Sequence, residues 1–163
     1  MSTNPRTHEF TIIIEPMPSI RLASAADASA IAAIYAPYCE QSAISFEEIA
    51  PTADEMAARI ARIGADRPWI VLEDNGTIVG YAYAAAHHER ASYRWSVSTA
   101  IYVDGGHARR GAGRALYSTL FDVLRLIGYY KATAGITLPN AASVGLHESF
   151  GFRLVGTYRD IGF

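Results

Sequence analysis

Residues 98–126 read STAIYVDGGHARRGAGRALYSTLFDVLRL and predict an apolar strand, a loop rich in glycine and arginine, and a helix beginning near Gly111. Glycines let a ligand approach the backbone closely and allow positive φ. The first turn of a helix offers free N–H groups and the positive end of the helix dipole, which together bind anions. Arg109, Arg110 and Arg114 add positive charge there. We therefore expect residues 109–114 to hold the phosphates of a nucleotide-like cofactor.

Two common phosphate-binding motifs do not fit this loop. Gly106 and Gly111 have the spacing of a P-loop, but Ala112 and Gly113 stand where its lysine and its serine or threonine are required. A dinucleotide fingerprint would need a third glycine at the position of Leu116 and should follow the first strand of a βαβ unit. Neither motif is therefore expected here.

The rest of the chain predicts one α/β domain with a single mixed, mostly antiparallel sheet and helices on both faces. Apolar periodicity predicts one helix after Asp27 and another after Thr52, where Thr52 and Glu55 have the form of a capping box. A short helix is expected from Asn140 to Gly151. The expected strands cover residues 19–23, 69–73, 77–86, 93–103, 130–137 and 152–158. Residues 1–18 are expected to form an extension, with a short strand at 10–15, and residues 19–163 the domain.

Composition narrows the classes of function. Half of the 163 residues are apolar and the net charge is −2, which argues against a nucleic-acid partner. Cys39 is the single cysteine, as expected for a cytoplasmic protein without disulfides. The apolar run at 10–14 is too short for a signal peptide, and no run is long enough to span a membrane. His87 and His88 are expected to face opposite sides of a strand, so no metal site is predicted.

Several separated motifs resemble the phosphinothricin acetyltransferase branch of the GNAT N-acetyltransferases. They are Ser45-Phe46-Glu47, Ala82-Tyr83-Ala84, Ile101-Tyr102-Val103, and Leu138-Pro139-Asn140 followed by Ser143 and Leu146-His147-Glu148-Ser149-Phe150-Gly151-Phe152. The resemblance covers residues 19–163. It implies the GNAT fold, acetyl-CoA as co-substrate, and a small amino acceptor such as phosphinothricin, methionine sulfoximine or methionine sulfone. The family's loop motif is Gln/Arg-x-x-Gly-x-Gly/Ala, from which this chain departs at Ala108.

The resemblance also implies roles for individual residues. The backbone of the strand at Ile101, Tyr102 and Val103 would pair with the pantetheine arm, the loop Arg109–Arg110–Gly111–Ala112–Gly113–Arg114 would hold the pyrophosphate, and Asn140 and Ser143 would contact the cofactor. Arg90 and Tyr93 would hold the acidic end of the acceptor, because an arginine fork matches paired oxygens. Phe46 would wall the pocket, and Glu47 is a candidate to bind the amine.

The sequence departs from the family at the expected catalytic base. The family places a glutamate in the motif Trp-Thr-Val-Glu, and this chain reads Trp95-Ser96-Val97-Ser98. A serine hydroxyl is not a base near neutral pH, so Ser98 is expected at best to hold a water. His147 is the best remaining candidate, because histidine exchanges protons near neutral pH.

The resemblance leaves further expectations open. The family continues past Asp160 through a Lys-x-Gly-x-Trp-x-Asp segment into a final strand. If residue 163 is the natural end, the sheet lacks its usual last strand, and a homodimer is expected to cover the exposed edge. Two other functions remain open: an acyl-CoA-binding module without catalysis, motivated by Ser98, and an acetyltransferase acting on a protein or a polyamine.

Overall fold

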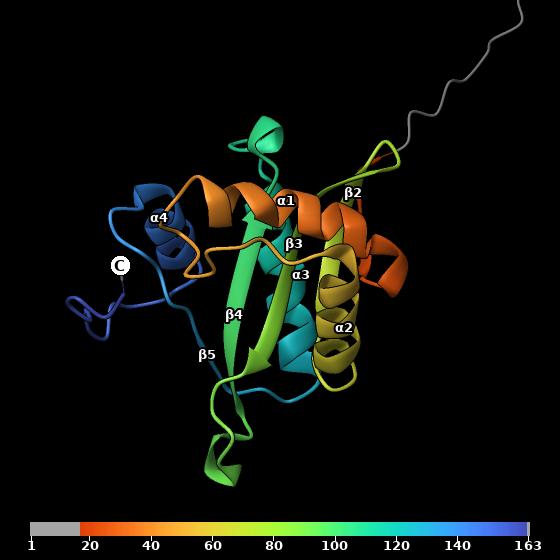
Figure 1. Cartoon of the computed structure of the whole chain (residues 1–163). Helices are drawn as coiled ribbons and strands as arrows, with labels where there is room; N and C mark the ends of the chain where they lie inside the picture. Colours follow the sequence, from red (N-terminus) through yellow and green to blue (C-terminus); the bar gives the residue numbers. More distant parts are fainter. Residues whose placement is uncertain (1–16, 163) are drawn as a thin grey trace, which may run out of the picture.

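A computed structural model describes residues 17–162 as one five-stranded sheet with helices on both faces (Figure 1). The strands lie in the order in which they occur in the chain, and each neighbouring pair is antiparallel except the last, which is parallel. They are β1 (Ser19–Leu22), β2 (Trp69–Asp74), β3 (Thr77–Ala86), β4 (Ser96–Val103) and β5 (Lys131–Thr133). The predicted mixed, mostly antiparallel α/β sheet is thus confirmed. The strand predicted at 10–15 lies outside the described residues.

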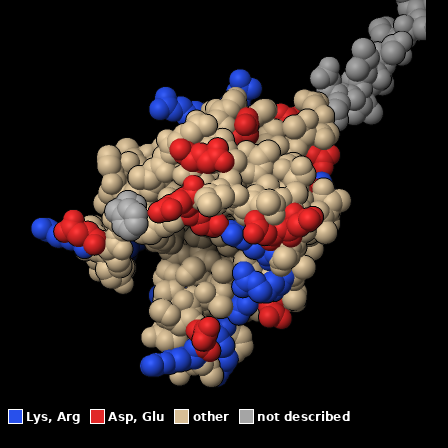
Figure 2. All heavy atoms as spheres, viewed as in Figure 1, with Lys and Arg blue, Asp and Glu red and all other residues tan. Residues whose placement is uncertain are grey.

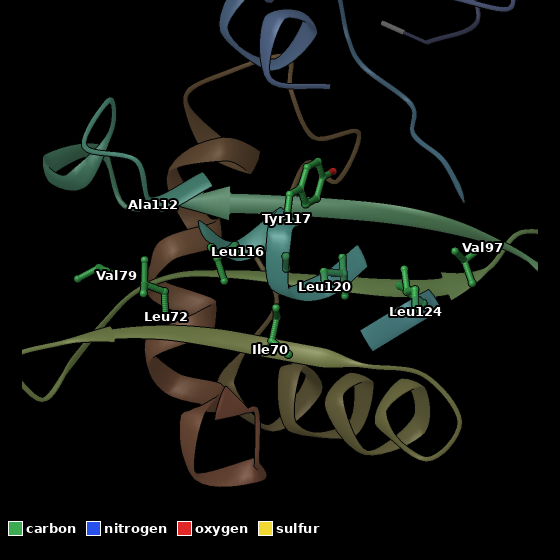
Figure 3. Packing of buried hydrophobic residues seen from close by; sticks show 11 residues of the cluster. Ile70, Leu72, Val79, Val97, Ala112, Leu116, Tyr117, Leu120 and Leu124 are labelled. Atoms are coloured by element: carbon green, nitrogen blue, oxygen red, sulfur yellow. The ribbon is translucent and has the colours of Figure 1, made fainter. Parts of the chain in front are cut away.

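The helices bury the two faces of the sheet in separate cores. α1 (Ala28–Glu40) and α2 (Ala53–Gly64) cover one face, where Ile31 and Met56 pack with Tyr81. α3 (Ala112–Leu126) covers the other, and its Leu116, Leu120 and Leu124 point at β2, β3 and β4 (Figure 3). α4 (Ala141–Ser149) follows β5. No helix within residues 17–162 combines the length and apolar composition needed to cross a bilayer.

Local signals fix where the elements begin and turn. Thr52 Oγ1 accepts from the Glu55 N–H at 3.3 Å and the Glu55 carboxylate accepts from the Thr52 N–H at 2.8 Å, so the predicted capping box starts α2. Asn75 and Gly76 both have positive φ, as a tight hairpin between β2 and β3 requires. These contacts explain why both elements were predictable from short motifs.

Three strand predictions are corrected by the structure. Residues 152–158 form no strand, and Leu154, Val155 and Tyr158 are exposed. The strand predicted at 130–137 is paired with β4 only at residues 131–133. The edge of β5 is therefore too short for a later segment of the chain to pair with it. The strand predicted from Tyr93 begins at Ser96, because residues 91–93 form a short 3₁₀ helix.

The loop between α1 and α2 is fastened to α2 by an ion pair. Both Glu47 carboxylate oxygens accept from Arg59 at 2.7 Å, and the Tyr35 hydroxyl adds a bond at 3.0 Å. The bonds from Arg59 lower the pKa of Glu47 below its usual 4.5. A lowered pKa means that the pair stabilises the fold above that usual value, and that this stability is lost as pH falls through the folded-state pKa.

Replacing Thr52 by alanine removes the hydroxyl that caps α2. We expect Thr52→Ala to lower the free energy of unfolding by about 1 kcal/mol, measured by urea denaturation at pH 7. Ser118→Ala, an exposed serine within α3, serves as the control and should change stability by less than about 0.5 kcal/mol. Equal effects in the two variants would contradict the capping role.

Replacing Glu47 by glutamine removes the charge that Arg59 holds. The wild type should be more stable than Glu47→Gln at pH 7, and the difference should shrink as pH falls below about 4.5, where protonation breaks the pair in the wild type as well. Urea denaturation at several pH values measures this. Glu48→Gln, an exposed neighbour in the same loop, is the control. A difference that stays constant with pH would refute the assignment.

Candidate active site

A fork between β4 and β5 opens the sheet in the middle of β4. The two strands pair only from Ser96 with Lys131 to Ser98 with Thr133. At the apex the Thr99 hydroxyl donates to the Thr133 carbonyl at 3.3 Å. Beyond this point the chain leads away toward α4 (Figure 1). Within the described residues no strand pairs with this edge of β4 after Ser98.

Backbone groups of β4 line the open side of this fork. The Asp104 N–H donates to Val79 of β3 at 2.9 Å, and the Trp95 carbonyl accepts from Lys131 on the β5 side at 3.2 Å. Backbone direction alternates along a strand, so the groups of Thr99, Ile101 and Val103 point to the fork. The Val103 carbonyl accepts from the Tyr38 hydroxyl at 2.6 Å. A ligand with amides could continue the parallel pairing at Ile101.

Side chains from several elements turn the fork into a cleft. One wall comes from β4 and α3, and the other from the segment after β5 and from α4. Its lining consists of Ile44, Thr99, Ala100, Ile101, Tyr102, Tyr117, Gly135, Ile136, Thr137, Asn140, Ser143 and His147. The predicted cofactor residues Ile101, Tyr102, Asn140 and Ser143 are therefore brought together here.

The first turn of α3 lies against Ile101, which lines this cleft. Gly111 has φ +87°, and no side chain among residues 17–162 caps the helix. A side chain at Gly113 would place its Cβ 3.2 Å from Leu146 and 3.7 Å from Ile101, so α3 begins tightly against α4 and β4. Arg109 and Arg110 are exposed beside this turn. Uncapped N–H groups with adjacent arginines form a site for an anion.

Arg114 and the loop before α3 have fixed surroundings. The Arg114 guanidinium lies 5.9 Å from the ring centre of Phe150, the residue that follows α4. Asp104 accepts from the Gly106 N–H at 3.0 Å and contacts His107 Nδ1 at 2.8 Å. The bond with His107 is the main cause that lowers the pKa of Asp104. These contacts hold the loop that leads into Gly111.

His147 is buried in the wall of the cleft with both ring nitrogens engaged. Nδ1 donates to the Ser143 carbonyl at 2.7 Å, so Nε2 accepts from the Tyr117 hydroxyl at 2.8 Å. Burial raises the pKa of Tyr117 to about 12, which keeps its hydroxyl protonated as the donor. Asn140 Oδ1 caps α4 at the Ser143 N–H, 3.1 Å away. Sequence reasoning missed Tyr117, although helical spacing from Gly113 and Leu120 places it on this face.

Ser98 belongs to a cluster of hydroxyls and an imidazole at the apex of the fork. Its Oγ lies 3.1 Å from His87 Nδ1 and 3.2 Å from Thr133 Oγ1, which is itself 3.1 Å from His87 Nδ1. The prediction that His87 and His88 face opposite sides is wrong, because β3 ends at Ala86 and the two rings lie 4.3 Å apart. Strand alternation no longer applies after Ala86.

The predicted acceptor residues lie on two different loops. Phe46 is 66% exposed, and an added Cβ on Gly162 would lie 2.6 Å from its ring. Both carboxylate oxygens of Glu47 accept hydrogen bonds from Arg59 in the ion pair. Arg90 and Tyr93 belong to the β3–β4 loop, where the Tyr93 ring packs 4.8 Å from His88. Figure 1 shows this loop apart from the loop between α1 and α2.

A second cavity of about 260 Å³ lies beneath α2 on the same face of the sheet as Ser98, and sequence reasoning did not find it. It is lined by Tyr35, Met56, Arg59, Arg62, Ile63, Trp69, Tyr81 and Tyr83. Figure 2 shows this face hollowed below the loop between α1 and α2, with acidic and basic side chains at the rim. Its residues come from four elements, so no local motif reveals it. Among residues 17–162, no cluster of three or more His, Cys, Asp or Glu side chains is arranged to hold a metal ion.

Comparison with known proteins identifies the fold and the family. Residues 20–163 match the Acetyltransferase (GNAT) domain. The chain is 37% identical over 144 residues to a phosphinothricin N-acetyltransferase of Streptomyces viridochromogenes, covering 88% of this chain and 79% of that protein. It is 34% identical over 145 residues to an L-methionine sulfoximine/L-methionine sulfone acetyltransferase of Salmonella typhimurium, covering 88% and 85%.

A solved structure gives the same result. The phosphinothricin acetyltransferase of Sinorhizobium meliloti in complex with acetyl-CoA superimposes with a TM-score of 0.85 at 33% identity, covering 90% of this chain and 80% of that one. The β4–β5 fork, the uncapped first turn of α3 and the sequence matches all point to the same family. The chain is a member of the GNAT family of N-acetyltransferases.

Proposed function

We propose that this chain transfers the acetyl group of acetyl-CoA to the amino group of a small amino-acid-like acceptor. The observation that carries the proposal is the fork of β4 and β5 beside the uncapped first turn of α3. The fork offers the Ile101 and Val103 backbone to the amides of pantetheine, and the turn offers N–H groups to the pyrophosphate. Arg109, Arg110 and Arg114 neutralise the phosphates, while Tyr102, Asn140 and Ser143 border the arm.

We infer the class of acceptor from the substrates in the names of the relatives and from the positive charge of an arginine assigned to the acceptor. The relatives named above act on phosphinothricin or on methionine sulfoximine and sulfone. Each carries an amino group and a tail with one or two oxygens on phosphorus or sulfur, which an arginine binds well. We assign Arg90 and Tyr93 to that tail and Phe46 to the wall of the pocket. The acceptor would enter on the α1–α2 face, where Figure 2 shows the hollow.

In the proposed reaction the free amine attacks the thioester carbonyl carbon directly. The acceptor ammonium first loses a proton, the carbon–sulfur bond then breaks, and the departing thiolate takes up the second amine proton. Ser98 lies at the apex of the fork, on the face of the sheet that α1 and α2 cover. His147 holds the Tyr117 hydroxyl in the cleft wall, on the opposite side of β4 from Ser98.

Two broader features belong to the same proposal. We assign the chain to the cytoplasm, because its one cysteine, Cys39, is buried and unpaired. We also propose a homodimer, supported by the exposed apolar side chains Leu154, Val155 and Ile161 in the segment after α4. Light scattering coupled to size exclusion would test the dimer, and a monomer at micromolar concentration would exclude it.

Charge reversal at the start of α3 should weaken cofactor binding. We expect Arg110→Glu to reduce acetyl-CoA affinity at least about tenfold at low ionic strength, with a smaller effect at high salt, because salt screens exposed charges. Isothermal titration calorimetry measures both. Arg125→Glu, at the opposite end of α3, is the matched control and should bind acetyl-CoA as the wild type does. Equal losses in both variants would show that general surface charge, not this turn, attracts the cofactor.

Acetyl transfer itself is tested by thiol release from acetyl-CoA. We expect turnover with methionine sulfone, methionine sulfoximine or phosphinothricin, and an N-acetylated product identified by mass spectrometry. Spermidine and a lysine-containing peptide serve as comparison acceptors. Tight acetyl-CoA binding without turnover on the amino acids would favour an acyl-CoA-binding module. Preferred turnover on spermidine or the peptide would reassign the acceptor.

A further inference from the structure

The cluster at the apex of the fork contains a residue with no role in the proposed reaction so far, His87. We infer that His87 accepts the proton that leaves the acceptor ammonium, and that Ser98 relays it. The inference rests on the proposed acetyl transfer and concerns the same site. It supplies the proton acceptor that the family glutamate provides and that Ser98 replaces in this chain.

The contacts of His87 support a relay. Its Nδ1 lies 3.1 Å from Ser98 Oγ and 3.1 Å from Thr133 Oγ1. The Thr133 hydroxyl can donate to the Val97 carbonyl at 3.2 Å, a group that only accepts. In the neutral tautomer with the ring proton on Nε2, the Ser98 hydroxyl donates to Nδ1, and Nδ1 is the atom that can take a proton. The last paired residues of the two strands therefore hold the ring at the point where the sheet opens.

The position of the cluster suits the chemistry. Ser98 is opposite Ala85 in β3, and the next residue along β4, Thr99, begins the unpaired edge proposed for the pantetheine arm. The side chains alternate along β4, so Ser98 shares a face with Tyr102 and therefore with α1 and α2. The acceptor is proposed to enter on that face. Ser98 and His87 are both half-buried, so neither residue is closed off from solvent.

The other candidate bases are already engaged. His147 is 4% exposed, and its two nitrogens bond to Tyr117 and to the Ser143 carbonyl. Glu47 accepts both of its short bonds from Arg59. His87 thus differs from both, since the hydrogen bonds that it makes within residues 17–162 are to two hydroxyls of the fork.

The proton balance of the relay is simple. The ammonium N–H bond breaks and its proton passes to Ser98 Oγ, while the Ser98 hydroxyl proton passes to His87 Nδ1. The serine is unchanged, the imidazole becomes a cation, and the neutral amine attacks the thioester. The second amine proton goes to the thiolate, and His87 later releases its proton to solvent. Overall an ammonium and acetyl-CoA give an amide, coenzyme A and one proton.

In the part of the chain that the structure describes, two titratable rings lie beside the His87 ring. The His88 ring lies 4.3 Å away and the Tyr93 ring 5.6 Å away, both from the β3–β4 loop. From β4 and β5 it meets the hydroxyls of Ser98 and Thr133, which carry no charge. Protonated His87 no longer accepts a proton, so kcat should fall at low pH.

The test compares kcat and its pH profile across variants at saturating substrates. We expect His87→Ala and His87→Gln to lose about 100-fold in kcat, a typical contribution of general-base catalysis, and to lose the fall at low pH. The KM for acetyl-CoA should stay as in the wild type, since His87 contacts side-chain hydroxyls of the fork and not the backbone groups proposed to pair with the cofactor. His88→Gln is the matched control and should keep the low-pH fall.

A second variant separates proton transfer from structural damage. Adding Ser98→Glu to His87→Ala places a carboxylate at the family position and should raise kcat at least tenfold over His87→Ala alone. The inference would be overturned if kcat of His87→Gln depended on pH as in the wild type. It would also be overturned if the double variant had a kcat no higher than that of His87→Ala. A wild type that transfers acetyl to no acceptor would instead reject the proposed function.

Discussion

The parting of β4 from β5 after Ser98 and Thr133 is the constraint on which the rest of the structure depends. Three paired positions hold the strands together, and the Thr99 hydroxyl closes the apex by bonding the Thr133 carbonyl. Because the pairing with β5 ends at Ser98, the backbone N–H and C=O groups of Ile101 and Val103 on that side face a cleft and not a strand. The same departure carries the chain to α4, whose Leu146 packs against the start of α3.

The two faces of β4 contribute differently to the site. On the face covered by α3, Tyr117 and His147 form a buried pair whose protons are fixed by the Ser143 carbonyl. On the face covered by α1 and α2, Ser98 and Thr133 meet His87 in a half-buried cluster. Fixed hydrogen bonds suit a wall that positions a substrate, whereas an imidazole bonded to hydroxyls suits an exchange of protons.

Much of the fold was predictable because its signals are local. Asn75-Gly76 defined a hairpin, Thr52 with Glu55 started α2, and Gly111 marked the start of α3. The strand predicted at 152–158 failed for a non-local reason: an apolar segment forms a strand only where a partner edge exists, and β5 supplies three residues.

The site was predictable in its backbone parts and less so in its side chains. The glycine loop and Ile101 were found from the sequence, because the backbone makes their contacts. The contact between His87 and Ser98 was not found. The long loop between β3 and β4 contains no tight-turn motif that would set the register and bring these two residues together. Glu47 was named for the amine, but its pairing with Arg59 depends on how the loop folds onto α2.

The open edge of β4 has a consequence for how the protein behaves between reaction cycles. In the proposed complex the pantetheine amides take the place of a missing strand, so each molecule of acetyl-CoA temporarily completes the sheet. The folded chain should then be more resistant to unfolding when loaded than when empty, by about 2.7 kcal/mol at a ligand concentration 100 times Kd. Local unfolding should then begin most readily where β4 and α4 line the cleft, when the cell is depleted of acetyl-CoA.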